Sequence, residues 1–322
     1  MDLTEDAGLP EPIYIFKKNM APVSCLYLCQ KKEFELLYVG TEEGLVHIWN
    51  LKTKREQKTI KVADTACLAI TQYNDNIITQ EKGYGLKYWR VVNLEWLLLK
   101  EVQTDYYGFC KIIVFNDRIY CPFDNGGIRV YQGEDTKVVM KCDVDRSRGE
   151  VMCMKFLKNC RELLVAYESG ILTMWSFEGE NPKIECEKEF NDTPMCLDVC
   201  DLTEEGILGS SGECLKKISV KNDNITEVRS TVLKNPGISC VSIRQDGKLL
   251  VAGCWDGRIR YFSMKHLTLL VVLDHHFVGP IQCVMFSEKC LSSYSAHVLF
   301  AAGCDGRISL WDLYTKDKLR PK

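Results

Sequence analysis

The feature that most constrains the fold is a short segment at residues 301–313, which reads AAGCDGRISLWDL. Its apolar start leads into Asp305-Gly306, a dipeptide that favours a tight turn because glycine readily adopts positive φ. Apolar and polar residues then alternate and end on Trp311-Asp312, as expected of a second strand. A single hairpin cannot bury its own apolar face, so we expect copies elsewhere in the chain.

Six further segments repeat this pattern, each with an apolar run, a glycine-containing turn and a strand that ends on a large anchor residue. The seven anchors are Trp49, Trp89, Tyr131, Trp175, Ile218, Phe262 and Trp311. Successive anchors are 40, 42, 44, 43, 44 and 49 residues apart, and an inserted loop at residues 288–296 explains the longest interval. This period is typical of four-stranded propeller blades. The sequence therefore predicts an all-β chain that forms a single seven-bladed β-propeller.

A cysteine lies in a short apolar strand upstream of each hairpin. These residues are Cys25, Cys67, Cys110, Cys153, Cys196, Cys240 and Cys283. We predict that they share one register position on the innermost strands, where blades crowd towards the axis, and that Cys25, Cys153 and Cys240 are buried. A metal ring or redox relay is the alternative, but thiolate ligands must converge within bonding distance and these belong to seven blades.

The two ends of the chain complete the expected organisation. Residues 1–12 are acidic and contain prolines, which predicts disorder. Residues 13–314 form the propeller, and residues 315–322 form a basic tail. The seventh blade lacks an outermost strand of its own, and residues 13–16 are a spare strand. Pairing the two would close the ring and cover an exposed edge.

Composition excludes several classes of protein. The 322 residues carry a formal net charge of −3, which gives no global field for nucleic acid or an anionic membrane. No apolar run approaches the roughly 20 residues that a bilayer requires. The acidic start lacks the apolar core of a secretory signal, so we expect a cytoplasmic protein that also enters the nucleus. The 17 cysteines include no Cys-x-x-Cys pair, which favours reduced thiols over disulfides or zinc.

No catalytic or cofactor motif is found. The five histidines form no His-Glu-x-x-His, and Gly209-Ser210-Ser211-Gly212 is a degraded hairpin turn rather than a nucleophile elbow. We therefore expect no enzyme, no metal site and no cofactor. The expected structural residues of the blades are the turn formers Asp256 and Asp305 and the anchors Trp49, Trp89, Trp175 and Trp311.

Aromatic residues gather where the hairpin turns and the links into the inner strands share one rim. The predicted protein-binding residues are Trp255, Tyr167, Phe123, Tyr84, Tyr106, Tyr107, His276 and Phe277. Large aromatics in exposed turns are common anchors of protein interfaces. The alternative for each is that it covers a neighbouring blade and is half-buried.

The Gly-x-x-Asp-Gly-x-Ile-x-x-Trp-Asp pattern resembles a WD40 repeat. The stretches GLVHIW (44–49), NPGI (235–238), AGCWD (252–256) and RISLW (307–311) resemble one family more closely. This is the family of guanine nucleotide-binding protein β-like protein 1 and ASTRA-associated WD-repeat proteins. The resemblance implies a scaffold without catalysis. It also implies an association with the cochaperone machinery, including the triple-T complex and the ASTRA assembly, that matures phosphatidylinositol-3-kinase-related kinases.

Departures from related families narrow the expected partners. Heterotrimeric G-protein β subunits carry a long N-terminal helix that coils with the γ subunit, and the start of this sequence has no heptad pattern; we expect no γ subunit. The usual histidine before the inner strand occurs only in the seventh copy, as His275 or His276. We expect a monomer inside a larger complex.

One motif leaves a second function open. Trp255-Asp256-Gly257-Arg258 fits the Trp-Asp-x-Arg pattern of substrate receptors for cullin-type ubiquitin ligases. In those receptors the Trp ends the third strand of a blade, whereas Trp255 is predicted to lie in a hairpin turn. A substrate receptor is therefore the alternative to a scaffold.

Overall fold

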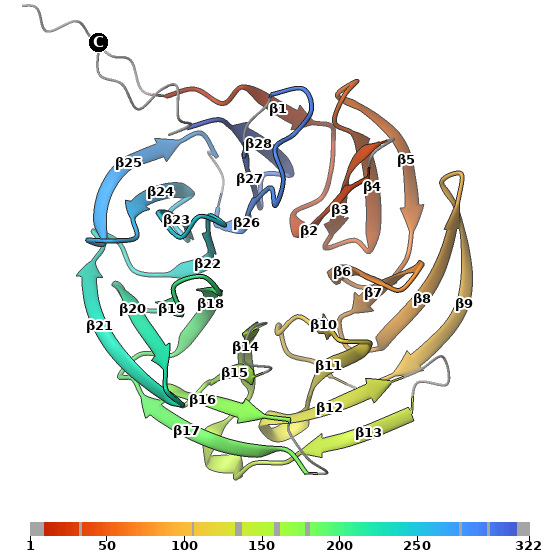
Figure 1. The fold of residues 1–322 in the computed structure, drawn as a ribbon. Coiled ribbons are helices and arrows are strands. Elements are labelled where there is room, and N and C mark those ends of the chain that lie inside the picture. Colours follow the sequence, from red (N-terminus) through yellow and green to blue (C-terminus); the bar gives the residue numbers. More distant parts are fainter. Residues whose placement is uncertain are drawn as a thin grey trace, which may run out of the picture.

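A computed structural model describes residues 10–31, 34–104, 106–132, 137–157, 162–177, 181–276, 279–294 and 297–313. In these segments the chain forms seven four-stranded antiparallel sheets arranged as the blades of a ring (Figure 1). The predicted seven-bladed β-propeller is confirmed. The described residues contain no helix with the length and apolar character needed to span a bilayer.

The strands of each blade follow one another in the sequence, from the channel outwards. Blade 1 contains β2 (Val23–Gln30), β3 (Glu35–Thr41), β4 (Leu45–Asn50) and β5 (Arg55–Lys61). Blade 2 contains β6 (Cys67–Tyr73), β7 (Asn76–Glu81), β8 (Gly85–Val92) and β9 (Glu95–Gln103). Blade 3 contains β10 (Ile113–Phe115), β11 (Arg118–Phe123), β12 (Gly127–Gln132) and β13 (Lys137–Cys142). Blade 4 contains β14 (Val151–Leu157), β15 (Glu162–Tyr167), β16 (Ile171–Ser176) and β17 (Lys183–Glu189).

The remaining blades keep the same order. Blade 5 contains β18 (Pro194–Cys200), β19 (Glu205–Ser210), β20 (Cys214–Lys221) and β21 (Asn224–Val232). Blade 6 contains β22 (Ile238–Ile243), β23 (Leu249–Cys254), β24 (Arg258–Ser263) and β25 (Thr268–Asp274). Blade 7 contains β26 (Ile281–Phe286), β27 (Leu299–Gly303) and β28 (Arg307–Trp311). Two short 3₁₀ helices, η1 (Asp124–Gly126) and η2 (Arg146–Arg148), lie between strands.

The outermost strand of blade 7 comes from the other end of the described chain. β1 (Tyr14–Lys17) pairs antiparallel with β28, and Tyr14 lies opposite Leu310. Phe16 on β1 is only 1% exposed and packs edge-on against Trp49 of blade 1. Figure 1 shows this seam, where the red β1 lies beside the blue β28. The predicted closure by an N-terminal strand is therefore confirmed.

The seven anchors occupy one equivalent place, near the end of the third strand of each blade. Trp49 pairs with Leu37, for example, and Trp311 with Leu299. In blades 1 to 6 the pairing with the outermost strand shifts directly before the anchor, as between Ile48 and Trp49. Such a bulge increases the local twist of the strand. The bulky side chain is thereby accommodated between neighbouring blades, where all seven anchors are buried.

The predicted single cysteine register is confirmed in five blades and wrong in two. The second-strand residues opposite Cys25, Cys153, Cys196, Cys240 and Cys283 are Gly40, Ala166, Gly209, Gly253 and Ala302. These partners are small because the thiol fills the space: a Cβ on Gly40 would lie 2.4 Å from the Cys25 Sγ. Of the three cysteines expected to be largely buried, Cys25 is buried, whereas Cys153 and Cys240 are half-buried and line the channel.

Blades 2 and 3 differ because their first two strands are joined by two-residue turns. Tyr73 pairs with Asn76, and Phe115 pairs with Arg118. The shorter turn moves the inner strand along its partner, so Cys67 pairs with Glu81 and Ala69 takes the register of the cysteines. Counting back from the pair of Ile113 with Tyr120 places Lys111, rather than Cys110, at that register in blade 3.

Candidate functional site

The hairpin turn of blade 7 is held by a chain of buried polar side chains. His276 Nδ1 lies 3.1 Å from Asp305 Oδ1, and His276 Nε2 lies 2.8 Å from Ser309 Oγ. Trp311 Nε1 donates to Ser309 Oγ at 2.7 Å. Burial would raise the pKa of Asp305, but the hydrogen bonds from His276 and the Arg307 N–H outweigh it and lower the pKa. The expected structural roles of Asp305 and Trp311 follow from this geometry.

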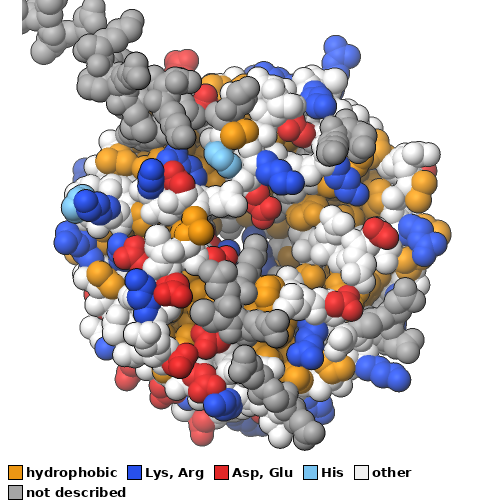
Figure 2. Space-filling view, in the orientation of Figure 1, with side chains coloured by type: hydrophobic (Ala, Val, Ile, Leu, Met, Phe, Trp, Pro, Cys, Tyr) orange, Lys and Arg blue, Asp and Glu red, His pale blue; other side chains and the backbone are white. Residues whose placement is uncertain are grey.

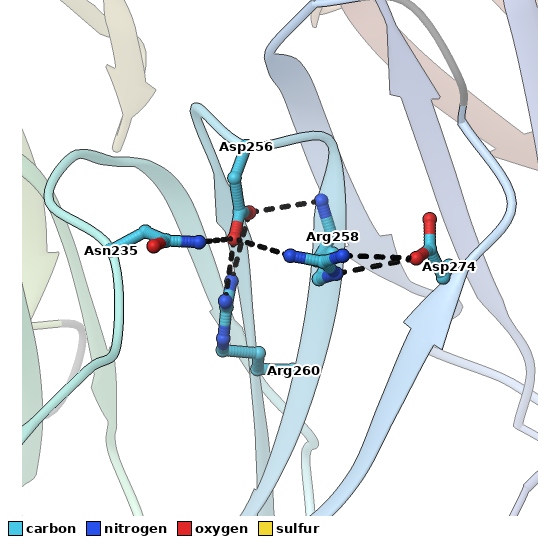
Figure 3. Close-up of polar contacts among 5 residues, drawn as sticks. All are labelled: Asn235, Asp256, Arg258, Arg260 and Asp274. Atoms are coloured by element: carbon cyan, nitrogen blue, oxygen red, sulfur yellow. Dashed lines mark hydrogen bonds and ion pairs between the residues drawn. The ribbon is translucent and has the colours of Figure 1, made fainter.

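Blade 6 builds the same corner from different side chains (Figure 3). Asn235 stands where blade 7 has its histidine, and its Nδ2 donates to Asp256 Oδ2 at 2.8 Å. Arg260, four residues after Asp256 as Ser309 is after Asp305, donates to both carboxylate oxygens at 3.0 and 2.6 Å. Arg258 donates to Asp274 at 3.2 Å and approaches Asp256 at 3.5 Å.

In this corner the Arg260 guanidinium takes the place of the Ser309 hydroxyl of blade 7. Burial would raise the pKa of Asp256, but the hydrogen bonds from Arg260 and Asn235 lower it far below its usual range. Asp256 is therefore an ionised anchor of the turn rather than a proton-transfer group. The turn holds Trp255 against Gly237, where a Cβ would lie 2.1 Å from the indole ring. Only glycine leaves room for the tryptophan in this position.

Four of the eight predicted rim residues lie at least partly at the surface. Tyr107 and Trp255 are exposed, whereas Phe123 and Tyr84 are half-buried. The Arg129 guanidinium covers the Phe123 ring at 4.2 Å, and Tyr84 OH donates to Glu101 at 2.9 Å. Phe277 lies outside the described residues.

The prediction of a surface role is wrong for the other three. Tyr167 is completely buried in the apolar core between blades 3 and 4. Tyr106 is buried in the same core, and its OH donates to the Val151 carbonyl at 3.1 Å. His276 is buried in the blade 7 corner described above. Each fills the space between elements, which is the alternative considered for rim aromatics.

Two exposed aromatic residues, Trp255 and Phe109, border a central channel. The half of the channel that opens beside the hairpin turns has a volume of about 710 Å³. It is lined by the starts of the inner strands, and Trp255, Phe109, Lys82 and Glu42 lie around it at the turns and links; we call these four residues the channel mouth. Phe109 is 67% exposed and Trp255 is 42% exposed. Lys82 Nζ lies 4.1 Å from the centroid of the Phe109 ring.

The opposite half of the channel has a different character. It is lined by the ends of the inner strands and has a volume of about 670 Å³. Lys155 Nζ pairs with Asp198 Oδ1 at 2.7 Å, and the Ile243 N–H donates to Asp198 Oδ2 at 2.7 Å. In this half of the channel the positive charge of Lys155 is neutralised by Asp198. In Figure 2, acidic and basic side chains are interspersed on the visible face around a central hollow.

Sequence reasoning missed Phe109 and Lys111, which lie in the link that enters blade 3. A signal was present: Asn116-Asp117 forms a two-residue turn with positive φ at both positions, and this shifts Lys111 towards the channel register.

The described residues offer little for metal or redox chemistry. They contain no group of three histidine, cysteine or carboxylate side chains placed to hold a metal ion. Burial raises the pKa of Cys153 to about 12 and also raises the pKa of Cys283, so these channel thiols are neutral at pH 7. The geometry suits binding by shape and charge.

Comparisons with known proteins agree with this architecture. The family described as WD domain, G-beta repeat matches residues 227–263, from the outer strand of blade 5 to the third strand of blade 6. Guanine nucleotide-binding protein subunit beta-like protein 1 of Mus musculus is 30% identical over 327 residues, covering 95% of this chain and 97% of the mouse protein. The chain belongs to the WD40-repeat family of the β-like protein 1.

Members of a second named group are also similar. ASTRA-associated protein 1 of Schizosaccharomyces japonicus is 35% identical over 100 residues, covering 30% of this chain and 25% of that protein. ASTRA-associated protein 1 of Verticillium alfalfae is 21% identical over 380 residues, covering 95% of this chain and 93% of that protein. WD40 propellers of this kind are protein-interaction scaffolds, and none of these relatives has a name that denotes an enzyme.

Proposed function

We propose that this WD40 protein is a non-catalytic scaffold that supports the maturation of phosphatidylinositol-3-kinase-related kinases together with the triple-T and ASTRA machinery. It would act in the cytoplasm and the nucleus. The observation that carries the proposal is the similarity of nearly the whole chain to the β-like protein 1 family, joined by relatives named for their association with ASTRA. The channel mouth supplies exposed aromatic side chains suited to a protein partner.

Affinity purification of the tagged protein tests this function. We expect triple-T subunits and a kinase of this class to co-purify, and we expect Trp255→Ala to weaken their recovery. The matched control is Leu97→Ala, because Leu97 is also an exposed apolar residue but lies on the outer strand β9. Depletion of the protein should lower the abundance of the kinases. Absence of these proteins from the purified material would refute the proposal.

The substrate-receptor alternative gains no support from the turn geometry. Trp255 and Asp256 lie between β23 and β24, not at the end of a third strand. Arg258, the last residue of the motif, is engaged by Asp256 and Asp274 within the blade. Recovery of a cullin adaptor in the same purification, lost on Arg258→Ala, would revive this function.

A further inference from the structure

Lys111 of blade 3 places a positive charge where the inner strands of other blades carry a cysteine. It occupies the register that cysteine holds in five other blades. Its ammonium crosses to the far side of the channel, where it donates to the Ser24 carbonyl of blade 1 at 3.2 Å and lies 3.6 Å from the Cys283 Sγ of blade 7. The side chain therefore reaches across the channel towards other blades, and it stays exposed to the channel space.

The charge of Lys111 has no counter-ion among the described residues. No carboxylate in the described segments forms an ion pair with it, and the only other charged residues that line this half of the channel are Lys82 and Glu42. An anion that enters the channel can reach this ammonium, because Lys111 is exposed to the channel space. The site is complementary to an anion.

The walls around Lys111 suit a guest with an apolar stem. Met152 and Met195 line the same half of the channel, and both are half-buried. Methionine is unbranched and adapts to irregular partners. Above them, Trp255 and Phe109 at the channel mouth offer exposed rings. An apolar stem with a negatively charged tip therefore matches the channel from its entrance to Lys111.

We propose that the channel receives a carboxylate-bearing side chain of a partner polypeptide. The carboxylate pairs with Lys111 Nζ, the stem lies against Met152 and Met195, and the neighbouring residues of the partner rest on Trp255 and Phe109. This inference rests on the proposed scaffold function and specifies how the scaffold recognises a partner. A free phosphate or chloride ion would satisfy the charge but would leave the rings of the channel mouth uncovered.

The test is a selection from a phage-displayed library of random linear 12-residue peptides on the full-length protein. We expect the enriched peptides to share an Asp or Glu at one position. A synthetic enriched peptide should bind Lys111→Met at least tenfold more weakly than wild type. It should bind the control Lys141→Met normally, since Lys141 is exposed on the outer strand β13. Replacing the shared acid by its amide should weaken binding to wild type but cause no further loss on Lys111→Met.

The melting temperature shows whether the variants fold. In Lys111→Met an apolar residue of similar length replaces a cation that has no counter-ion, so we expect the melting temperature to be preserved. Lys111→Gln serves the same purpose if Lys111→Met does not fold. Recovery of no peptide, of peptides without a shared acid, or of peptides that bind Lys111→Met unchanged would each overturn the inference. Co-purification of cellular partners with Lys111→Met at wild-type levels would also overturn it while leaving the scaffold function intact.

Discussion

Replacing Phe16 by alanine should loosen the seam at which the ring closes. Phe16 is 1% exposed and packs against Tyr14 and Trp49, with ring centroids 4.8 and 5.4 Å away. It belongs to one core cluster with residues of blades 1 and 7, such as Leu37 and Phe300. A buried Phe→Ala change costs about 3–5 kcal/mol because it removes apolar contacts and leaves a cavity. Alanine keeps the backbone pairing of β1, so the loss of unfolding free energy measures side-chain packing across the seam.

The expected loss converts into a measurable change in melting temperature. With an unfolding entropy of ~2.1 cal/mol/K per residue, a chain of this length should melt about 4–7 °C lower. Differential scanning calorimetry gives this shift, and hydrogen exchange should show faster opening of β1 and β28 but not of β16 on the opposite side of the ring. The control is Leu97→Ala, which removes a side chain that is 62% exposed.

Two results would refute this reasoning. One is a Phe16→Ala melting temperature equal to that of Leu97→Ala. The other is a hydrogen-exchange rate that increases equally in all seven blades, because the pairing of β1 would then not stabilise blade 7 more than the other blades.

The other predictions concern the turn of blade 6 and the cysteine register. The depressed pKa of Asp256 means that its stabilisation is complete above the unfolded-state value of ~3.9 and is lost as pH falls through the folded-state pKa. Asp256→Asn should therefore lower the free energy of unfolding by about 3 kcal/mol at pH 7, since Arg260 loses its counter-charge. In urea unfolding the difference should shrink at pH 3; the same difference at both pH values would contradict the ion-pair argument. Gly40→Ala should cost about 1–3 kcal/mol by overpacking, and adding Cys25→Ala should restore most of it because the new Cβ meets the Cys25 Sγ. A double variant no more stable than Gly40→Ala would exclude the thiol as the cause.

The repeat pattern was sufficient to predict the blades and their closure. The anchors from Trp49 to Trp311 were placed correctly because in five of the seven copies the anchor follows the turn glycine by five residues, a spacing that local backbone preference determines. The seam was predictable because the seventh blade was one strand short and residues 13–16 were in excess. Because an exposed strand edge is normally paired or covered, the unpaired blade and the spare strand could be matched without any knowledge of packing.

The candidate site was predicted less well. Trp255 and Tyr107 are exposed as expected, but Tyr167 and Tyr106, which are also aromatic residues in the turns and links, are buried. A tyrosine beside a turn can be either exposed or buried, and the packing of the neighbouring blade decides which of the two occurs. The space beside Tyr167 is closed by blade 3, whose contact with blade 4 is not encoded in the local sequence.

The sequence by itself determined the number of blades, their boundaries and the residues that cap each hairpin, because these depend on turns and strand periodicity within about forty residues. Only the tertiary structure decided what lies on the axis. A two-residue turn in blade 3 shifted its inner strand, so that a lysine rather than a cysteine faces the thiols of the other blades. That juxtaposition brings Lys111 beside Ser24 and Cys283, which are 87 and 172 residues distant in the chain. It exists only because the ring closes.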